Sequence, residues 1–261
     1  MRQEPTVDTS SIKDFFDDMA VERDAFFRAN PVLDYDQQTR SRAVLRLLDP
    51  QRGETVLDIG CGNARDIVPI LRAGARIVGV DLSEGMIAQA RRDMAAAGYA
   101  DVVEFEVGDA TQLRFQAGSF DKVLCSEVIE HIPDAAAAIA EIHRVLKPGG
   151  RLVLSTPNQA SWYGFDRYVL WTKVLRRPWN HPFDNWRNMD QVRSLLEGHA
   201  FRIISSGTAC YLPGFLLTYH LPAFVQRVLV RCVRRLERPA SRIAPRSGYL
   251  VVVSAEKAPF L

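Results

Sequence analysis

The sequence predicts an α/β protein built on a parallel sheet. Between residues 55 and 156, short apolar runs typical of buried strands alternate with longer segments of helical periodicity. A glycine-containing turn follows the first of these runs, as is usual where a strand leads into a helix in such folds. The 261 residues suit one large domain, or one domain with an added lobe; we interpret 1–261 as a single domain.

The expected elements follow in chain order. Two N-terminal helices, at 11–30 and 35–48, form a helical cap over 11–48, and Pro31 separates them because the residue before a proline avoids helix. Right-handed crossovers should connect the parallel strands. The strands are expected at 55–59, 76–81, 102–107, 120–126, 151–156, 201–206 and 247–255, and the helices between them at 64–73, 84–97, 135–146 and 189–198.

Two insertions interrupt this alternation after the core at 54–158. The first, 159–187, contains all four tryptophans, and the second, 211–238, is apolar and then basic. At helical pitch its arginines cover one side and its apolar residues the other. This pattern is typical of a helix on a membrane surface or an anionic partner, although a lid helix with a solvated basic face fits it too. We expect both insertions to form the substrate side. The arginines are Arg227, Arg231, Arg234 and Arg235.

Composition limits the partners and the compartment. A net charge of +2 gives no argument for a nucleic-acid partner. The four cysteines form no CxxC pair and no disulfide framework, which favours a reducing compartment. The polar N-terminus is not a signal peptide, and no run approaches the ~20 apolar residues that span a bilayer. We therefore expect a cytoplasmic protein, with peripheral membrane contact through 211–238.

The strongest motif runs from Asp58 through Ile-Gly-Cys-Gly-Asn to Ala64. Gly60 and Gly62 lack Cβ, so the backbone can turn sharply and a ligand can approach it closely. A dinucleotide fingerprint would need a third glycine at position 65, which is Arg65. The carboxylate of Asp58 would also repel a pyrophosphate. The motif therefore favours a ligand with a cationic group, such as the ammonium of a methionine moiety.

Two further acids lie at the ends of the next two strands: Asp81 ends the second strand, and Asp109 follows the third. Asp81 can accept hydrogen bonds from both ribose hydroxyls, and Asp109 can accept one from the exocyclic amine of adenine. Leu82 and Ala110 can enclose the adenine ring between them. Any single acid could merely cap a strand or helix, but three at successive strand ends form a specific constellation. Together they predict a site for a cationic adenosine derivative.

These segments resemble the class I S-adenosyl-L-methionine (SAM)-dependent methyltransferases. The matching pieces are DIGCGNA, GVDLSEGMI, VGDATQL, FDKVLCSEVIEHI and LKPGGRLVLSTPN, which occur over 54–158 in the family's order. One departure is Ala64, where glycine is commoner and where we expect alanine to cost little. The resemblance implies a Rossmann-like seven-stranded, mostly parallel sheet with an antiparallel last strand, and SAM as cofactor. The predicted cofactor contacts are Asp58, Gly60, Cys61, Gly62, Asp81, Leu82, Asp109, Ala110 and Ser126.

A second group of chemical side chains follows the fourth strand. If Glu127, Glu130 and His131 lie on a helical turn, they share one face. Adjacent carboxylates repel unless a cation or a proton lies between them. The E-x-x-E-H pattern resembles that of ubiquinone-pathway O-methyltransferases and of small-RNA 3′-end 2′-O-methyltransferases. Both resemblances imply a metal, here Mg²⁺ or Mn²⁺, with His181 as the candidate fourth ligand.

Direct catalysis without a metal is the alternative. His131, with Glu130 beside it, can act as general base because the ordinary pKa of histidine is near ~6.5. The leading hypothesis is O-methylation of an apolar hydroxylated small molecule, such as a prenylated quinone precursor or another lipid. N- or C-methylation stays open, since the same core motifs serve all three. An NAD-dependent oxidoreductase is disfavoured by Arg65 and Asp109, and a SAM-binding module without catalysis by the presence of a base.

Overall fold

One seven-stranded sheet forms the centre of the computed structural model, which describes residues 9–20, 30–176, 181–211 and 221–258. The strand order is β3-β2-β1-β4-β5-β7-β6. The pairs from β3 through β5 are parallel, and β7 runs antiparallel to both of its neighbours. This confirms the predicted fold class. The strands are β1 (Thr55–Ile59), β2 (Arg76–Asp81), β3 (Val103–Val107), β4 (Phe120–Ser126), β5 (Leu146–Pro157), β6 (Phe201–Ala209) and β7 (Leu250–Lys257).

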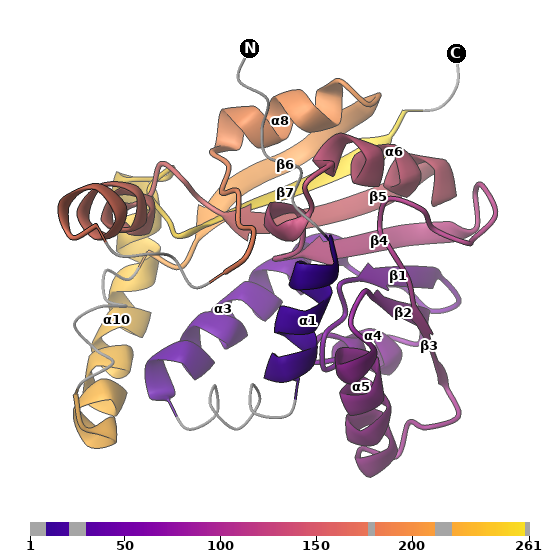
Figure 1. Cartoon of the computed structure of the whole chain (residues 1–261), viewed down its shortest axis with the longest axis horizontal. Helices are drawn as coiled ribbons and strands as arrows, with labels where there is room; N and C mark the ends of the chain where they lie inside the picture. Colours follow the sequence, from indigo (N-terminus) through magenta and orange to yellow (C-terminus); the bar gives the residue numbers. More distant parts are fainter. Residues whose placement is uncertain (1–8, 21–29, 177–180, 212–220, 259–261) are drawn as a thin grey trace.

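Helices cover both faces of this sheet (Figure 1). Side chains alternate between the two faces along a strand, so each strand supplies both cores. Val56 and Leu124 pack into the core beneath α3, α4 and α5, whereas Leu57 and Val123 pack into the core beneath α6 and α8. The helices are α3 (Pro31–Leu48), α4 (Ile67–Arg72), α5 (Glu84–Ala96), α6 (Ala135–Val145) and α8 (Met189–Glu197).

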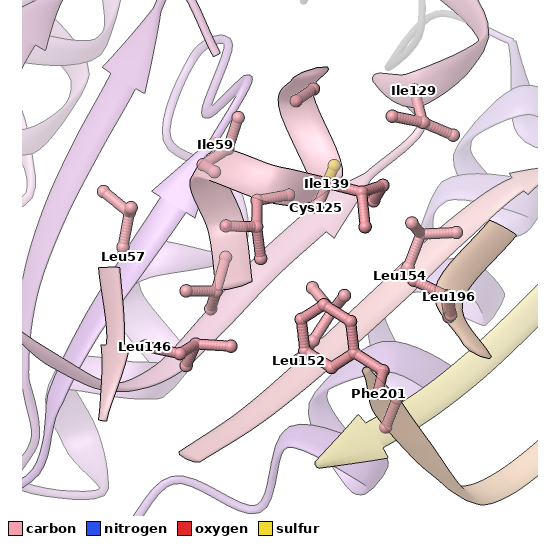
Figure 2. Packing of buried hydrophobic residues seen from close by; sticks show 14 of the residues in the cluster. Leu57, Ile59, Cys125, Ile129, Ile139, Leu146, Leu152, Leu154, Leu196 and Phe201 are labelled. Carbon is pink, nitrogen blue, oxygen red and sulfur yellow. The ribbon is translucent and has the colours of Figure 1, made fainter. Parts of the chain in front are cut away.

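The core beneath α6 and α8 holds the central strands rigidly in place. Figure 2 shows Leu57 of β1, Cys125 of β4 and Ile139 of α6 among the side chains of this core, with Leu196 of α8 near Leu154 of β5. All five side chains are fully buried. Burial of this kind stabilises each aliphatic side chain by about 1.5–3 kcal/mol. The carboxyl ends of β1 and β4 are thereby fixed relative to each other.

The N-terminal helices differ in detail from the prediction. α3 begins at Pro31, four residues before its expected start, and the side chain of Asn30 caps it by accepting from the backbone N–H groups of Val32 and Leu33. Proline is well suited to the first helical position, where its missing N–H costs nothing. The preceding helix, α1 (Thr9–Met19), ends earlier than expected. Residues 21–29 of the predicted helix lie outside the described residues.

Asp17 fixes α1 on the start of α5. Its Oδ1 accepts hydrogen bonds from the backbone N–H of Gly85, at 2.8 Å, and from the hydroxyl of Ser83. Both donors lie at the first turn of α5, directly after β2. These bonds lower the pKa of Asp17 against the opposing effect of burial. As a result, α1 lies over the carboxyl end of β2.

The two insertions contain the remaining helices. The first forms α7 (Trp162–Phe165) and the π-helical segment η2 (Asp166–Val174). The second forms α10 (Ala223–Ile243), which packs on α3 through Val230 and Val233. Residues 177–180, including Trp179, and 212–220 lie outside the described residues. Within the described residues, no helix has both the length and the apolar character that crossing a bilayer requires.

Candidate active site

A cavity of about 740 Å³ lies at the carboxyl ends of β1 to β4. Ligands of open α/β sheets bind at this edge, where the strand order reverses. β1 and β4 are the neighbours at which it reverses here. Every predicted cofactor residue lines the cavity: Asp58, Gly60, Cys61, Gly62, Asp81, Leu82, Asp109, Ala110 and Ser126. The predicted catalytic and metal residues Glu127, Glu130, His131 and His181 line it as well.

The turn after β1 requires glycine for two reasons. Gly60 and Gly62 have φ of 65° and 52°, in the left-handed region that favours glycine. A Cβ on Gly60 would lie 2.2 Å from Cγ2 of Val128, which follows β4. The backbone N–H groups of Gly60 and Cys61 also donate to the carbonyl oxygen of Val80, at 2.7 and 3.1 Å. The turn is therefore held between β2 and the segment after β4.

Ala64 corrects one expectation. Its side chain is fully buried, but its φ is 63°. An alanine in the left-handed region costs about 1–2 kcal/mol. The small size of alanine fits the space, as expected, yet its backbone carries a penalty that glycine would avoid.

Backbone donors orient both of the later acids. Asp81 accepts from the N–H of Gly62 through Oδ2 and from the N–H of Ser83 through Oδ1, both at 2.9 Å. Asp109 accepts from the N–H and the hydroxyl of Thr111, both at 2.8 Å. The two carboxylates are thus fixed by their own loops. Such preorganisation lowers the entropy lost when a ligand binds.

Asp58 lies in an unfavourable position for a carboxylate. It is buried, and burial raises its pKa well above the usual range, assisted by the negative charge of Asp66. The guanidinium of Arg40 lowers the pKa of Asp58, and the charge of Asp81 raises it further. A cation in the cavity would favour the ionised form of Asp58. The cavity is therefore electrostatically suited to a positively charged ligand.

Two cavity residues on α3 had no signal in the sequence. Arg40 lies 3.5 Å from Asp66 (Nη2 to Oδ2), and its Nε is buried with no hydrogen-bond partner among the described residues. Asp36 lies one turn earlier, and its Oδ1 is buried without such a partner. Burial and the charge of Glu237 raise the pKa of Asp36 to about 7. Neither belongs to a motif, because only tertiary packing brings α3 to the cavity.

The segment after β4 does not form the predicted helical turn. Glu127 has a φ of 59°, and the short 3₁₀ helix η1 (Ile129–His131) begins two residues later. The prediction that Glu127 shares a helical face with Glu130 and His131 was therefore wrong. The hydroxyl of Ser155 instead donates to Oε1 of Glu127 at 2.9 Å. The hydroxyl of Ser126 lies 2.9 Å from that of Ser155 and can donate to it.

His131 and Glu130 form a close pair at the cavity wall. Nδ1 of His131 lies 3.1 Å from the carbonyl oxygen of Phe183. A carbonyl only accepts hydrogen bonds, so Nδ1 carries the proton and Nε2 is the basic nitrogen of the neutral ring. Nε2 lies 3.9 Å from Oε1 of Glu130. Burial raises the pKa of Glu130 well above its usual range, as do the charges of Glu127 and Asp184, and Thr156 donates to its other oxygen at 3.1 Å.

Aromatic rings form much of the remaining wall. The rings of His131 and His181 stack at 5.4 Å, with Phe16 edge-on to His131 at 5.2 Å. In a second group, the ring of Tyr249 lies 4.7 Å from that of Tyr163 and 5.7 Å from that of Trp186. Of these six rings, His131 alone comes from residues 54–158. Sequence reasoning singled out His131 and His181 but did not assign the other four rings to the site.

A buried ion pair supports the second aromatic group. Nη1 of Arg167 lies 2.9 Å from Oδ2 of Asp184, and both side chains are buried. The guanidinium of Arg167 also lies over the rings of Tyr168 and Trp186, at 4.8 and 4.6 Å from their centres. Nε1 of Trp186 donates to Asp184 at 2.9 Å. This network, which the sequence did not reveal, fixes the orientation of Trp186 at the cavity.

The geometry does not support the predicted metal site. Within the described ranges, no group of three or more acidic, histidine or cysteine side chains is arranged to hold a metal ion. Glu127 accepts from Ser155, and Glu130 accepts from Thr156. His131 directs Nδ1 at a carbonyl, and its ring lies nearly parallel to that of His181. The four predicted ligands share a cavity wall without converging on one point, so no metal-dependent step follows from this arrangement.

Comparison with known proteins finds similarity to methyltransferases. A family model described as "Methyltransferase domain" matches residues 57–154. A ubiquinone biosynthesis O-methyltransferase of Pseudomonas paraeruginosa is 40% identical over 108 residues, which are 41% of this chain and 46% of that protein. A demethylmenaquinone methyltransferase of Streptomyces avermitilis is 30% identical over 167 residues, 64% of this chain and 68% of that protein. The chain thus spans less than half the length of the first of these relatives.

A solved structure supports the fold. It is a SAM-dependent methyltransferase from Thermotoga maritima, described as a possible histamine N-methyltransferase. The two chains superpose with a TM-score of 0.66 and 20% identity, over 94% of this chain and 99% of that chain. At this level of identity the likeness concerns the architecture alone.

Replacing Gly60 tests whether contact with Val128 constrains the turn. Gly60→Ala should lower the free energy of unfolding by more than Gly118→Ala, measured by urea denaturation. The two glycines have φ of 65° and 68°, so they share a backbone cost of about 1–2 kcal/mol, but an added Cβ meets no atom within 4 Å at Gly118. The double variant Gly60→Ala/Val128→Ala should recover the excess loss. Equal losses in the two single variants would contradict the proposed constraint.

Replacing Asp36 tests its raised pKa. The folded chain keeps a proton that the unfolded chain releases above the ordinary pKa of 3.8, so the free energy of unfolding falls as pH rises toward 7. Asp36→Asn removes this loss. At about pH 8 the variant should be more stable than the wild type by on the order of 2 kcal/mol, allowing for partial solvent screening, and at about pH 4 the two should be alike.

The matched control for this measurement is Gln37→Ala on the same helix. Because it removes no ionisable group, its effect on the free energy of unfolding should be the same at both pH values. Urea unfolding at both pH values provides the comparison. A stability difference between Asp36→Asn and the wild type that is the same at both pH values would rule out a raised pKa of Asp36.

Proposed function

We propose that this chain, which belongs to the SAM-dependent methyltransferase family, methylates a hydroxyl oxygen on an apolar, hydroxylated small molecule. One observation carries the proposal: the acids of the cofactor motifs and the His131–Glu130 pair line the same cavity. A cofactor site and a base are therefore within reach of one substrate. The aromatic rings around the pair supply an apolar environment for that substrate.

The residues of the cavity fit the cofactor. Asp58, a buried acid with a raised pKa, suits the ammonium group, and the unpartnered Nε of Arg40 suits the carboxylate. Asp81 is oriented to accept from the ribose hydroxyls and Asp109 from the adenine amine. Leu82 and Ala110 would enclose the adenine ring. When bound, the cofactor supplies an electrophilic methyl group on its sulfur.

His131 is the proposed general base. With Nδ1 held by the Phe183 carbonyl, Nε2 is the nitrogen that can take the proton from a substrate hydroxyl. A positive charge on His131 favours ionisation of Glu130, 3.9 Å away, so the two groups change charge together. Glu130 is held for this purpose by Thr156. Removal of the hydroxyl proton raises the nucleophilicity of the oxygen.

The cavity wall favours a flat aromatic substrate. Phe16 and the stacked rings of His131 and His181 form one apolar surface, and Trp186 and Tyr249 form another. Aromatic rings pack favourably against such surfaces and exclude water from the base. The names of two relatives refer to ubiquinone biosynthesis and to demethylmenaquinone. A quinone-related phenol is consistent with both observations.

Replacing Asp81 tests the cofactor site. Asp81→Ala should weaken SAM binding, measured by calorimetry, by at least about 30-fold, because charge-assisted hydrogen bonds contribute about 1.5–3 kcal/mol each. Glu104→Ala, which removes an exposed carboxylate from the adjoining strand β3, is the matched control and should bind like the wild type. Circular dichroism of both variants excludes unfolding. An unchanged affinity of Asp81→Ala for SAM would contradict the assignment of Asp81 to the cofactor site.

Replacing His131 tests the base. With octyl protocatechuate as acceptor and labelled SAM as donor, His131→Ala should lower kcat by about 10²–10⁴-fold without changing the affinity for SAM. The lost rate should partly return at high pH, where hydroxide in solution ionises the phenol. His143→Ala is the control, because His143 of α6 packs against Phe201 of β6 and does not line the cavity. A kcat equal to that of the wild type would remove His131 from the mechanism.

The product of the same assay distinguishes the acceptor atom. Proton NMR separates a methoxy group from a methyl group on ring carbon. A methoxy product supports O-methylation. A methyl group on ring carbon would mean that the acceptor atom is carbon and not oxygen, while the assignments of the cofactor site and the base would stand.

A further inference from the structure

Helix α10 presents three different faces. The first packs against the protein: Val230 and Val233 contact Val32 and Tyr35 of α3. Glu237 on the same face accepts from the hydroxyl of Tyr35, at 3.4 Å, and from the N–H of Tyr211, at 3.0 Å. Because the face that packs on α3 is narrow, most of the circumference of the helix is exposed to solvent.

The second face is basic. The α10 sequence contains six arginines and one acid, Glu237, which is turned toward α3. Arg227, Arg231 and Arg235 are exposed. Arg234 is exposed as well, with its guanidinium 5.5 Å from the centre of the Tyr35 ring. The outward charge of the helix is therefore entirely positive among its described side chains.

The third face is apolar and exposed. Phe224, Val228 and Leu236 are 64%, 54% and 60% exposed, and Leu229 and Ile243 are exposed too. At helical pitch Val228, Leu229, Leu236 and Ile243 lie on one side, and Phe224 lies where this side borders the arginines. A surface helix ordinarily turns its apolar side toward the core. On α10 only part of the apolar side, Val230 and Val233, packs on α3, and the rest is exposed, which indicates a partner.

A second apolar surface lies on the first insertion. Trp162 and Phe165 of α7 are exposed, and their rings stack at 5.4 Å. Exposed apolar residues continue along the following segment with Leu170, Val174 and Leu175. Figure 1 shows α7, η2 and α10 at the same end of the molecule, opposite the end formed by β3. Tryptophan side chains favour the interface between membrane and water.

We propose that α10, assisted by α7 and η2, docks this end of the molecule on the surface of an anionic lipid bilayer. The helix would lie in the plane of the interface, with Phe224, Val228 and Leu236 in the acyl boundary. The arginines beside them would meet lipid phosphates, to which the purely positive outward charge is complementary. The narrow face that packs on α3 would keep the helix attached to the enzyme.

This surface adjoins the cavity through α7. Trp162 is exposed, whereas the next residue, Tyr163, lines the cavity and lies against Tyr249. A substrate dissolved in the bilayer could therefore enter without crossing water. This step rests on the proposed function, but the docking itself does not, because binding to vesicles requires no methyl transfer.

Vesicle flotation with the full chain tests the docking. The wild type should float with vesicles of phosphatidylcholine containing phosphatidylglycerol, and not with vesicles of phosphatidylcholine alone. Arg231→Glu/Arg235→Glu should lower the partition coefficient at least about tenfold, because each basic residue near an anionic surface contributes about 1 kcal/mol. Phe224→Ser/Leu236→Ser should lower it by a similar factor, through loss of apolar contact.

Two matched double variants test whether flotation depends on this surface or on charge and apolar residues anywhere on the protein. Arg46→Glu/Arg92→Glu changes exposed arginines on α3 and α5, and Val102→Ser/Ile204→Ser changes exposed apolar residues elsewhere. Both should float like the wild type. Thermal unfolding and SAM binding of all variants report on the fold and on the cofactor site independently of lipid.

Three outcomes would overturn the proposal. One is no flotation of the wild type with anionic vesicles. Another is equal loss of flotation in the α10 variants and in their matched controls. The third is a dimer in light scattering that Phe224→Ser/Leu236→Ser converts to monomer, because the apolar face would then be covered by a second copy of the chain.

Discussion

The parallel pairing of β1 with β2 and β4 is the constraint on which the site depends. Its register places Ile59 beside Val80 and Cys125, so the turn at Gly60, the carboxylate of Asp81 and the segment after Ser126 leave the sheet at one edge. Val128 fills the space that a side chain on Gly60 would need. The cofactor turn and the segment that bears the base are therefore in close steric contact, so a change in the backbone of one requires a change in the other.

The same edge concentrates negative charge where water is largely excluded. Asp58 and Glu130 are both buried, and the pKa of each is raised by burial and by neighbouring acids. Carboxylates placed in this way destabilise the empty fold, because ionisation is costly away from water. Arg40 on α3 offsets part of that cost for Asp58, and Arg167 on η2 pairs with Asp184, one of the acids that raise the pKa of Glu130. The arrangement is poorly suited to an anionic ligand and well suited to a cationic one.

The sequence predicted the parts of the site that are local in the chain. Asp58, Asp81 and Asp109 lie at the carboxyl ends of strands whose parallel order is itself predictable, so their meeting follows from topology. Asp36 and the Arg167–Asp184 pair could not be found in this way, because tertiary packing of α3 and of the first insertion brings them to the cavity. The error at Glu127 has a different origin: helical spacing was assumed for a residue whose backbone is left-handed.

Helix α10 links the outer surface to the cavity through one side chain. Glu237 faces inward from α10. Burial raises the pKa of Asp36, which lines the cavity, and the negative charge of Glu237 raises it further. The outward side of the same helix carries the arginines and the exposed apolar residues. A shift of α10 on α3 would move Glu237 relative to Asp36 and so change the proton affinity of a cavity acid. The exposed surface and the charge that acts on this cavity acid therefore belong to one helix.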